Sequence, residues 1–234
     1  MKTSIGKETI LSERTLRRLA DVGMIGPIVF GITIIILTFL EYDFITRIGW
    51  DPLQESDVAW PSGLALGPYG WLQVANFVLF GVCLIALAFG LHRGVRAGGR
   101  GSWVGPALLV VAGVALVLSG FKTDPNISEP PQTWHGEIHV LAFLLLIFSL
   151  LPSFFVLWRR LRRDPLWRGY GRYTLVSGVL YTILFLISFM GPFIPELVAF
   201  YLFLGVILAW IEVMALHLRS IATGASAERV APAG

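Results

Sequence analysis

Six apolar stretches, each about as long as a membrane-spanning helix, dominate this sequence. A bilayer core about 30 Å thick is crossed by about 20 consecutive apolar residues of helix. Every backbone polar group in lipid must also be hydrogen-bonded internally, which an α-helix achieves within one segment. We therefore predict an all-α fold, a polytopic membrane helix bundle with six transmembrane helices. The predicted spans cover 22–40, 71–91, 103–121, 138–158, 173–190 and 197–218.

The composition agrees with this fold class. Only 14% of the residues are charged, against about 25% in an ordinary soluble domain, and 56% are hydrophobic. A soluble fold of this size cannot bury that much apolar surface, which excludes a cytosolic globular enzyme or a disordered chain. The single cysteine, Cys83, excludes an intramolecular disulfide. We expect it to be a small buried hydrophobic residue.

The basic residues predict the orientation. Of the 18 Lys and Arg residues, all but Arg47 and Lys122 fall at the ends of the spans that would share one side. Positive charge in short loops marks the cytoplasmic side, so we expect a cell (inner) membrane protein with cytoplasmic N- and C-termini. Because topology accounts for the basic residues, we expect membrane lipids as partners and no nucleic acid. The sequence predicts no oligomeric state.

The chain divides into three parts. Residues 1–19 form a basic cytoplasmic N-terminal segment, 20–218 the six-span transmembrane domain, and 219–234 a small, polar tail that we expect to be disordered and cytoplasmic. The longest loop, 41–69, contains several Pro and Gly residues. A structureless loop of that length is uncommon, so we expect it to fold over the outer mouth of the bundle.

The most informative polar residues lie where the predicted third span ends and the fourth begins. His135 and His139 are spaced i, i+4 and therefore share one helix face, whereas Glu137 points the other way. A short loop holds Asp124 at the same mouth. Two imidazoles and a carboxylate form a candidate zinc site, with Asp124, His135 and His139 as ligands. The same groups could equally form a proton relay or bind a lipid headgroup.

Further polar residues of the outer half could converge on this site. Gln73 and Asn76 lie at i and i+3 near the start of the second span, Asp43 follows the first span, and Ser62 lies in the loop. Glu212, in the last span near its inner end, forms a second polar site, since ionisable groups within a span mark function or helix pairing.

Three short patterns carry a family resemblance. The first is Ser62-Gly63 followed by Gly67-Pro68 and Gly70-Trp71; the others are the turn from Gly120-Phe121 to Asp124-Pro125 and the run Trp134-His135-Gly136 to His139. With them, the chain over about 20–218 resembles the domain-of-unknown-function 998 (DUF998) family of prokaryotic multi-pass membrane proteins. The resemblance implies a bundle of six or seven spans and brings no activity with it.

Two hypotheses for the function follow. In the first, the protein binds or moves a lipid or small molecule through an outer-facing polar pocket built from Asp124, His135 and His139, with Asp43, Gln73 and Asn76. In the second, it is an intramembrane metal-dependent lipid hydrolase, in which zinc on Asp124, His135 and His139 activates a water molecule.

Overall fold

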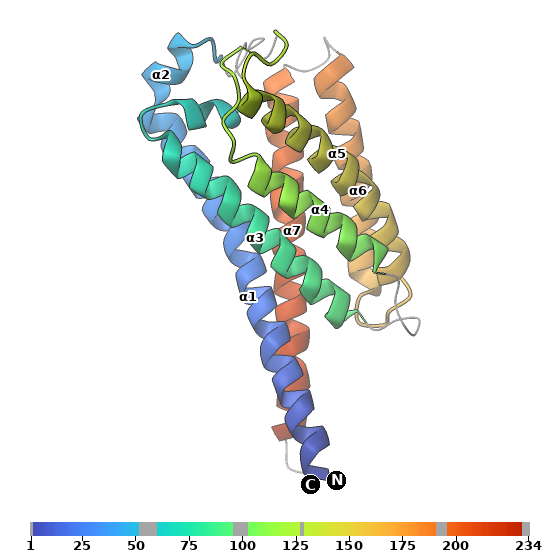
Figure 1. The fold of residues 1–234 in the computed structure, drawn as a ribbon. Coiled ribbons are helices and arrows are strands. Elements are labelled where there is room, and N and C mark those ends of the chain that lie inside the picture. Colours follow the sequence, from blue (N-terminus) through green and yellow to red (C-terminus); the bar gives the residue numbers. More distant parts are fainter. Residues whose placement is uncertain (1, 52–59, 96–102, 127–128, 191–195, 231–234) are drawn as a thin grey trace.

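The computed structural model describes residues 2–51, 60–95, 103–126, 129–190 and 196–230, and in these ranges it contains helices and no strands (Figure 1). This confirms the predicted all-α class. In chain order the elements are α1 (Lys2–Leu40), α2 (Tyr42–Arg47), the 3₁₀ helix η1 (Ser62–Leu66), α3 (Gly70–Gly94), α4 (Val104–Leu118), α5 (Trp134–Leu161), α6 (Arg168–Met190) and α7 (Glu196–Val230).

Five helices of the described chain are long and apolar enough to cross a membrane. They are found within α1, α3, α5, α6 and α7, so the protein has multi-pass membrane character. The predicted third span corresponds to α4, which is apolar but has only 15 residues. At 1.5 Å per residue it extends about 22 Å, less than the hydrocarbon thickness. It ends at Leu118 because the chain then turns through Ser119 and Gly120.

Helical structure continues beyond the predicted spans at both ends of the chain. α1 begins at Lys2, so most of the predicted N-terminal segment continues the first helix. α7 continues to Val230, past the predicted start of the tail at 219. Both extensions lie at the same end of the bundle (Figure 1).

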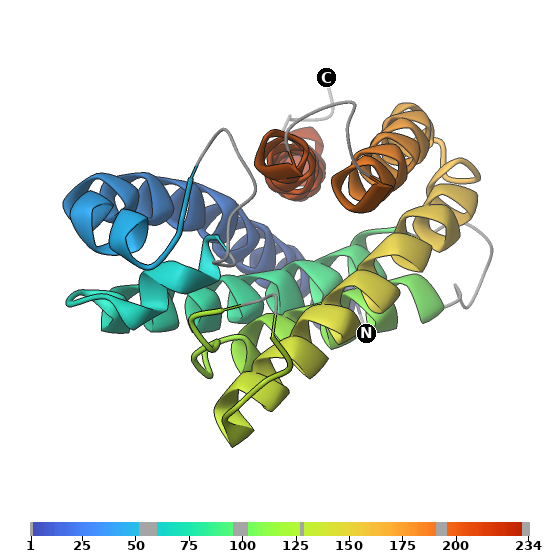
Figure 2. The ribbon, with the colours of Figure 1, turned by 90° about the horizontal axis from the view of Figure 1, so that it is seen from above.

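The helices form a ring that follows the chain order. α3 packs on α1, α4 on α3, α5 on α4, α6 on α5 and α7 on α6, and α7 then packs against α1 to close the ring (Figure 2). A smaller contact between α3 and α7 crosses it.

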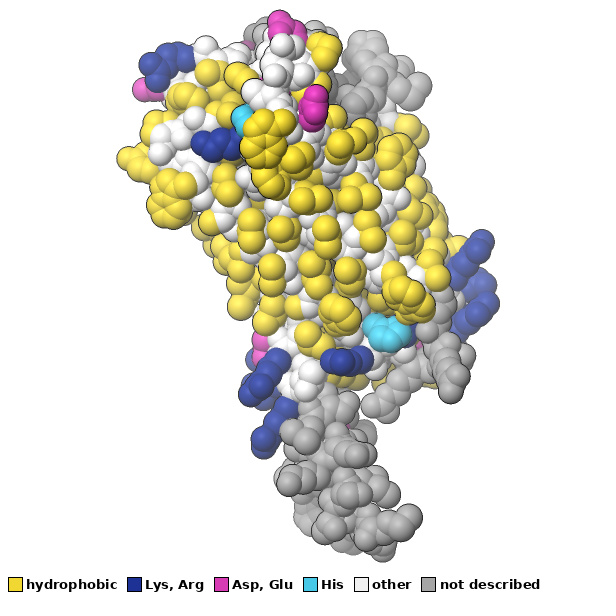
Figure 3. Space-filling model, in the orientation of Figure 1, with side chains coloured by type: hydrophobic (Ala, Val, Ile, Leu, Met, Phe, Trp, Pro, Cys, Tyr) yellow, Lys and Arg dark blue, Asp and Glu magenta, His cyan; other side chains and the backbone are white. Residues whose placement is uncertain are grey.

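Large side chains fill the interior, and other hydrophobic side chains face outwards. Phe154, Trp210 and Tyr181 are fully buried, whereas Ile32 is 53% and Phe148 73% exposed. Figure 3 shows hydrophobic side chains across the middle of one face and most of the visible Lys and Arg towards its lower end. This distribution suits a lipid environment around the middle of the bundle.

Close helix contacts depend on glycine at one crossing in particular. A Cβ atom on Gly81 of α3 would overlap the carbonyl oxygen of Gly113 of α4, and one on Gly113 would lie 2.7 Å from the carbonyl oxygen of Gly81. Small residues at such crossings allow backbones to approach in membrane bundles. The glycine pair thus allows the short α4 to pack closely against α3.

Polar contacts hold one end of the bundle, here called the inner end, which contains the end of α3 and the turn between α5 and α6. The guanidinium of Arg160 donates hydrogen bonds to the carbonyl oxygens of His92 and Val95, at 2.9 and 2.8 Å. The indole of Trp167 donates to the carbonyl oxygen of Gly94 at 3.2 Å. These groups satisfy the last carbonyls of α3, which have no partner within that helix.

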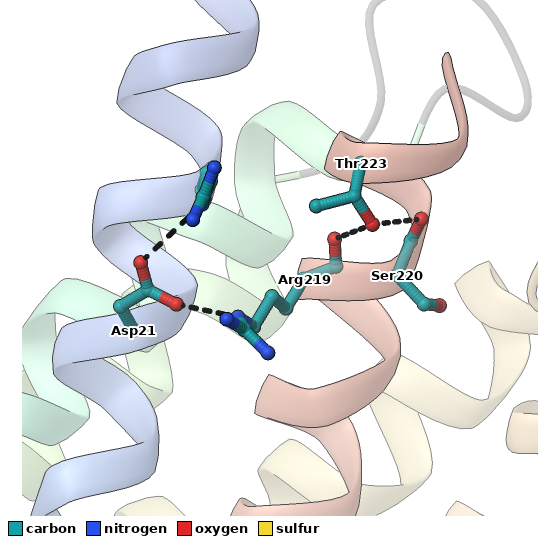
Figure 4. Close-up of polar contacts among 5 residues, drawn as sticks. Asp21, Arg219, Ser220 and Thr223 are labelled. Atoms are coloured by element: carbon teal, nitrogen blue, oxygen red, sulfur yellow. Dashed lines mark hydrogen bonds and ion pairs between the residues drawn. The ribbon is translucent and has the colours of Figure 1, made fainter. Parts of the chain in front are cut away.

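An ion pair links the first and last helices at the same end. Arg219 of α7 lies 2.8 Å from Asp21 of α1, and Arg17 lies 3.8 Å from the other oxygen of that carboxylate (Figure 4). The hydroxyl of Thr223 donates to carbonyl oxygens of its own helix, one of them that of Arg219. The inner ends of α1 and α7 therefore lie side by side.

Candidate functional site

The opposite end of the bundle, here called the outer end, is organised around the start of α5. Thr133 is the N-cap residue of this helix: its backbone is extended and its hydroxyl oxygen accepts a hydrogen bond from the amide of Gly136 at 3.1 Å. A threonine in this position satisfies one of the amides that a helix leaves unpaired at its start. The cap therefore fixes the start of α5 and with it the positions of His135 and His139.

Asp124 supports this cap from the preceding turn. Its Oδ1 accepts from the hydroxyl of Thr133 at 2.6 Å, and its Oδ2 accepts from the amides of Gln132 and Thr133 at 2.8 and 3.2 Å. The hydrogen bond from the Thr133 hydroxyl is the main cause that lowers the pKa of Asp124, although burial opposes it. A Cβ atom on Gly136 would overlap Oδ2, so glycine is required for this approach.

The two histidines of α5 bond to successive carbonyl groups of one segment. Nδ1 of His135 lies 2.8 Å from the carbonyl oxygen of Lys122, and Nδ1 of His139 lies 2.7 Å from that of Phe121. A carbonyl oxygen only accepts, so each Nδ1 carries the proton. The i, i+4 spacing thus holds the segment after α4 along the first turns of α5.

The other nitrogen of His139 faces a residue from a distant part of the chain. Its Nε2 lies 2.9 Å from Oγ of Ser62, at the start of η1. Because Nδ1 carries the proton, Nε2 of the neutral ring is an acceptor, and the Ser62 hydroxyl donates to it. Ser62 is half-buried and His139 is buried.

A buried carboxyl group fastens the loop that carries Ser62. Oε1 of Glu41, the residue after α1, accepts from the amide of Tyr69 at 2.6 Å, and the side chain packs against Gly67. Glu41 is only 2% exposed, and this burial raises its pKa. The short η1 helix is therefore fixed at both of its ends, by Glu41 and by His139.

A cavity of about 80 Å³ lies inside the helix ring beneath Ser62 and His139. Apart from the hydroxyls of Ser62, Ser119 and Tyr181 and the ring of His139, its lining is apolar. On α5 the lining extends from His139 to Leu150, eleven residues later, which corresponds to about 16 Å of helix. The cavity thus has a polar outer end and continues into the apolar middle of the bundle.

One polar atom deeper in this lining has no protein partner. The hydroxyl of Tyr181 of α6 is fully buried and makes no hydrogen bond to any described residue. Its ring packs against Phe154, Phe185 and Phe203. Burying an unpaired hydroxyl costs free energy, so a polar group of a bound molecule would find a partner here.

The structure separates the predicted pocket residues into four places. Asp124 and His135 brace the start of α5, and His139 lines the cavity. Gln73 and Asn76 are buried between α3 and α1, where the Asn76 amide donates to the carbonyl oxygen of Phe30. Asp43 is exposed on α2.

Zinc binding by Asp124, His135 and His139 stays a prediction. Within the part of the chain that the structure describes, no group of three His, Cys, Asp or Glu side chains is placed to hold a metal ion. Each of the three predicted ligands makes the protein contacts given above.

Glu212, the predicted second site, lies near the middle of α7. It is half-buried, and its Oε2 is buried without a hydrogen-bond partner among the described residues. It does not line the cavity beneath Ser62.

The sequence placed Ser62 in a loop, among the polar residues that could converge on this site, but it did not predict a hydrogen bond between Ser62 and His139. The two residues are 77 positions apart, and the loop between α1 and α3 has no periodicity that would orient its side chains. The only sequence signal was the Ser62-Gly63 pair within the pattern that carries the family resemblance.

Comparison with known proteins confirms that resemblance. No curated protein and no solved structure matches the chain. A family model described as "Protein of unknown function (DUF998)" matches residues 24–219, which include α3 to α6, the second part of α1, most of α7, and the whole outer site. The chain therefore belongs to the DUF998 family.

Proposed function

We propose that this protein binds the hydrocarbon chain of a membrane lipid within its helix ring, with the polar group of the lipid near Ser62 and His139. The cavity carries this proposal, because it joins a polar outer end to an apolar interior. Its volume of about 80 Å³ is well below the roughly 300–1,000 Å³ of pockets for drug-sized ligands. A slender hydrocarbon chain suits such a space better than a compact polar solute does.

In this proposal the residues of the predicted Asp/His pocket have two different roles. His139 contacts the ligand at the outer end of the cavity, while Asp124 and His135 hold the adjoining turn in place. Tyr181 offers a second hydrogen-bonding group further in, which suits a carbonyl or hydroxyl on the ligand.

The proposal also includes a topology of six spans with both termini in the cytoplasm of a prokaryotic cell, in its inner membrane. Five crossings would put the two ends of the chain on opposite sides, whereas Asp21 and Arg219 form an ion pair at one end. A crossing by α4 resolves this, and the basic residues at that end favour the cytoplasmic side. The local bilayer would adapt to the short α4.

Photochemical crosslinking tests lipid binding. The full chain, reconstituted in lipid nanodiscs, is irradiated with a fatty acid that carries a diazirine midway along its chain, and the adducts are mapped by mass spectrometry. We expect adducts on cavity-lining segments of α5 and α7. Leu150→Phe, which fills the cavity, should reduce these adducts at least tenfold.

Leu144→Phe is the matched control, because Leu144 is on the same helix but 43% exposed on its outer surface. It should leave the cavity adducts unchanged. If Leu150→Phe does not fold, Ile207→Phe fills the same cavity from α7. Adducts that are confined to outward-facing residues, or that persist in a folded cavity-filling variant, would overturn the proposal.

A further inference from the structure

The pair formed by Ser62 and His139 has the arrangement of a nucleophile and its general base. The two side chains are within hydrogen-bond distance, at 2.9 Å, which is the range required for proton transfer from a serine hydroxyl. The direction of the hydrogen bond is also suitable, since the hydroxyl donates and Nε2 accepts.

The remaining nitrogen of His139 is oriented by a third group. Its Nδ1 donates to the carbonyl oxygen of Phe121 at 2.7 Å. In serine–histidine sites such a partner fixes the tautomer and stabilises the imidazolium that forms when the base takes up a proton. A backbone carbonyl here occupies the position that a carboxylate takes in the Ser-His-Asp triad.

The surroundings indicate the substrate class. Ser62 and His139 both line the cavity, at the end from which its apolar lining begins. Ser62 lines the cavity and is only half-buried, so part of this residue stays accessible. A fatty-acyl ester could place its chain in the cavity and its carbonyl carbon beside the serine oxygen, with the alcohol part outside.

We propose that Ser62 and His139 form a catalytic dyad that hydrolyses a fatty-acyl ester. This inference rests on the proposed binding of a hydrocarbon chain in the cavity and adds a covalent reaction at its outer end. It uses the same pocket as the predicted lipid hydrolase but a different nucleophile, the Ser62 hydroxyl.

The reaction has two balanced steps. His139 Nε2 takes the hydroxyl proton as Ser62 Oγ bonds to the carbonyl carbon; the ester bond then breaks, the alcohol leaves with that proton, and the acyl group remains on Ser62. Water from the outer surface then gives its proton to Nε2 and attacks the acyl carbon. The carboxylic acid leaves, and Ser62 recovers its proton.

Covalent labelling tests the nucleophile. The full chain in lipid nanodiscs is treated with a long-chain alkyl fluorophosphonate, which loses fluoride when a serine oxygen bonds to its phosphorus. We expect one adduct, on Ser62, and none in Ser62→Ala. Ser149→Ala is the matched control, because the Ser149 hydroxyl is buried in α5 and donates to carbonyl oxygens of its own helix; its labelling should equal that of the parent protein.

The general base is tested by rate. His139→Gln should slow labelling, and the hydrolysis of a p-nitrophenyl fatty-acyl ester, by about 10²–10⁴-fold. Because His139 also holds η1, the variant could fail to fold; His139→Ala with added imidazole then gives a second measurement. Recovery of labelling with imidazole supports a base, and a purely structural histidine would give none.

The outcomes separate this inference from the proposed function. Crosslinking of the diazirine fatty acid in the cavity without fluorophosphonate labelling of Ser62 would overturn the dyad and leave lipid binding intact. Failure of both would overturn both. Labelling of a different serine, or equal rates for the parent protein and a folded His139→Gln variant, would also overturn the dyad.

Discussion

Oδ1 of Asp124 lies 2.6 Å from the hydroxyl oxygen of Thr133, the residue that caps α5. The same carboxylate accepts two backbone amides of the turn, and the cap in turn holds Gly136. The residues of the family pattern at the outer end of the bundle therefore hold the backbone in place. They set the position of α5, and with it that of His139.

Replacing Gly136 with alanine should destabilise the protein. A Cβ atom there would overlap Oδ2 of Asp124, so the carboxylate would have to move away from the amides it binds. We expect a loss of about 1–3 kcal/mol, as for other overpacked sites, measured as a lower thermal midpoint in detergent. Gly205→Ala in α7 is the control, because nothing lies within 4 Å of its added Cβ. Equal midpoints for the two variants would contradict the overlap.

The two outer carboxyl groups should give pH dependences of opposite sign. The pKa of Asp124 is lowered in the folded protein, so its stabilising contribution is complete above the ordinary value of 3.8 and is lost as the pH falls below it. The pKa of Glu41 is raised by burial, so folded stability is highest below the ordinary value of 4.5 and decreases as the pH rises through the higher folded pKa. Asp124→Asn should remove the acid loss and Glu41→Gln the loss at higher pH. Thermal midpoints measured from pH 3 to 8 check both, and an unchanged profile in either variant would contradict its assignment.

Arg160→Lys should weaken the inner end of the bundle. The guanidinium donates to two carbonyl oxygens at the end of α3 through one nitrogen, and a lysine ammonium does not reproduce its planar geometry. We expect a loss of about 1.5–3 kcal/mol, the range for hydrogen bonds to a charged group. Arg159→Lys alters the exposed neighbour on the same turn and should change stability by less than about 0.5 kcal/mol. Chemical unfolding of the two variants side by side provides the measurement.

Cysteine accessibility should reveal whether α4 crosses the membrane. In a Cys83→Ala background, single cysteines replace Arg93 before α4, Lys122 after it, and Arg163 after α5; all three positions are exposed. In intact cells a membrane-impermeant maleimide should label only the cysteine at 122, because the other two face the cytoplasm in the proposed topology. Labelling at 93 as well as 122 would show that α4 does not cross.

The helices were predictable from sequence because lipid imposes a simple rule. A run of apolar residues long enough to span the core must form helix, whatever its neighbours are, and α1, α3, α5, α6 and α7 follow that rule. α4 is the exception: the apolar pattern continues to Phe121, but Ser119 and Gly120 already belong to a turn. The hydropathy pattern alone does not reveal the residue at which a helix ends.

The site was only half predictable for a related reason. Helical periodicity places His135 and His139 on one face, and a short loop brings Asp124 near them. Their hydrogen-bond partners, however, are backbone carbonyls, which no side-chain pattern reveals. Ser62 lies beside His139 because Glu41 holds the loop that follows Ser62 through the amide of Tyr69. These contacts form only after α1, α3 and α5 have packed together.

The closed ring of helices has a consequence for how the chain assembles. α3 packs on α1, and α4, α5 and α6 each pack on the helix before them. The bundle can therefore grow by short-range steps as successive helices enter the membrane. Closure is different, since α7 must return to α1 across nearly the entire sequence. Until α7 packs against α1, the interior beneath Ser62 is open along one side, and only that contact completes the cavity.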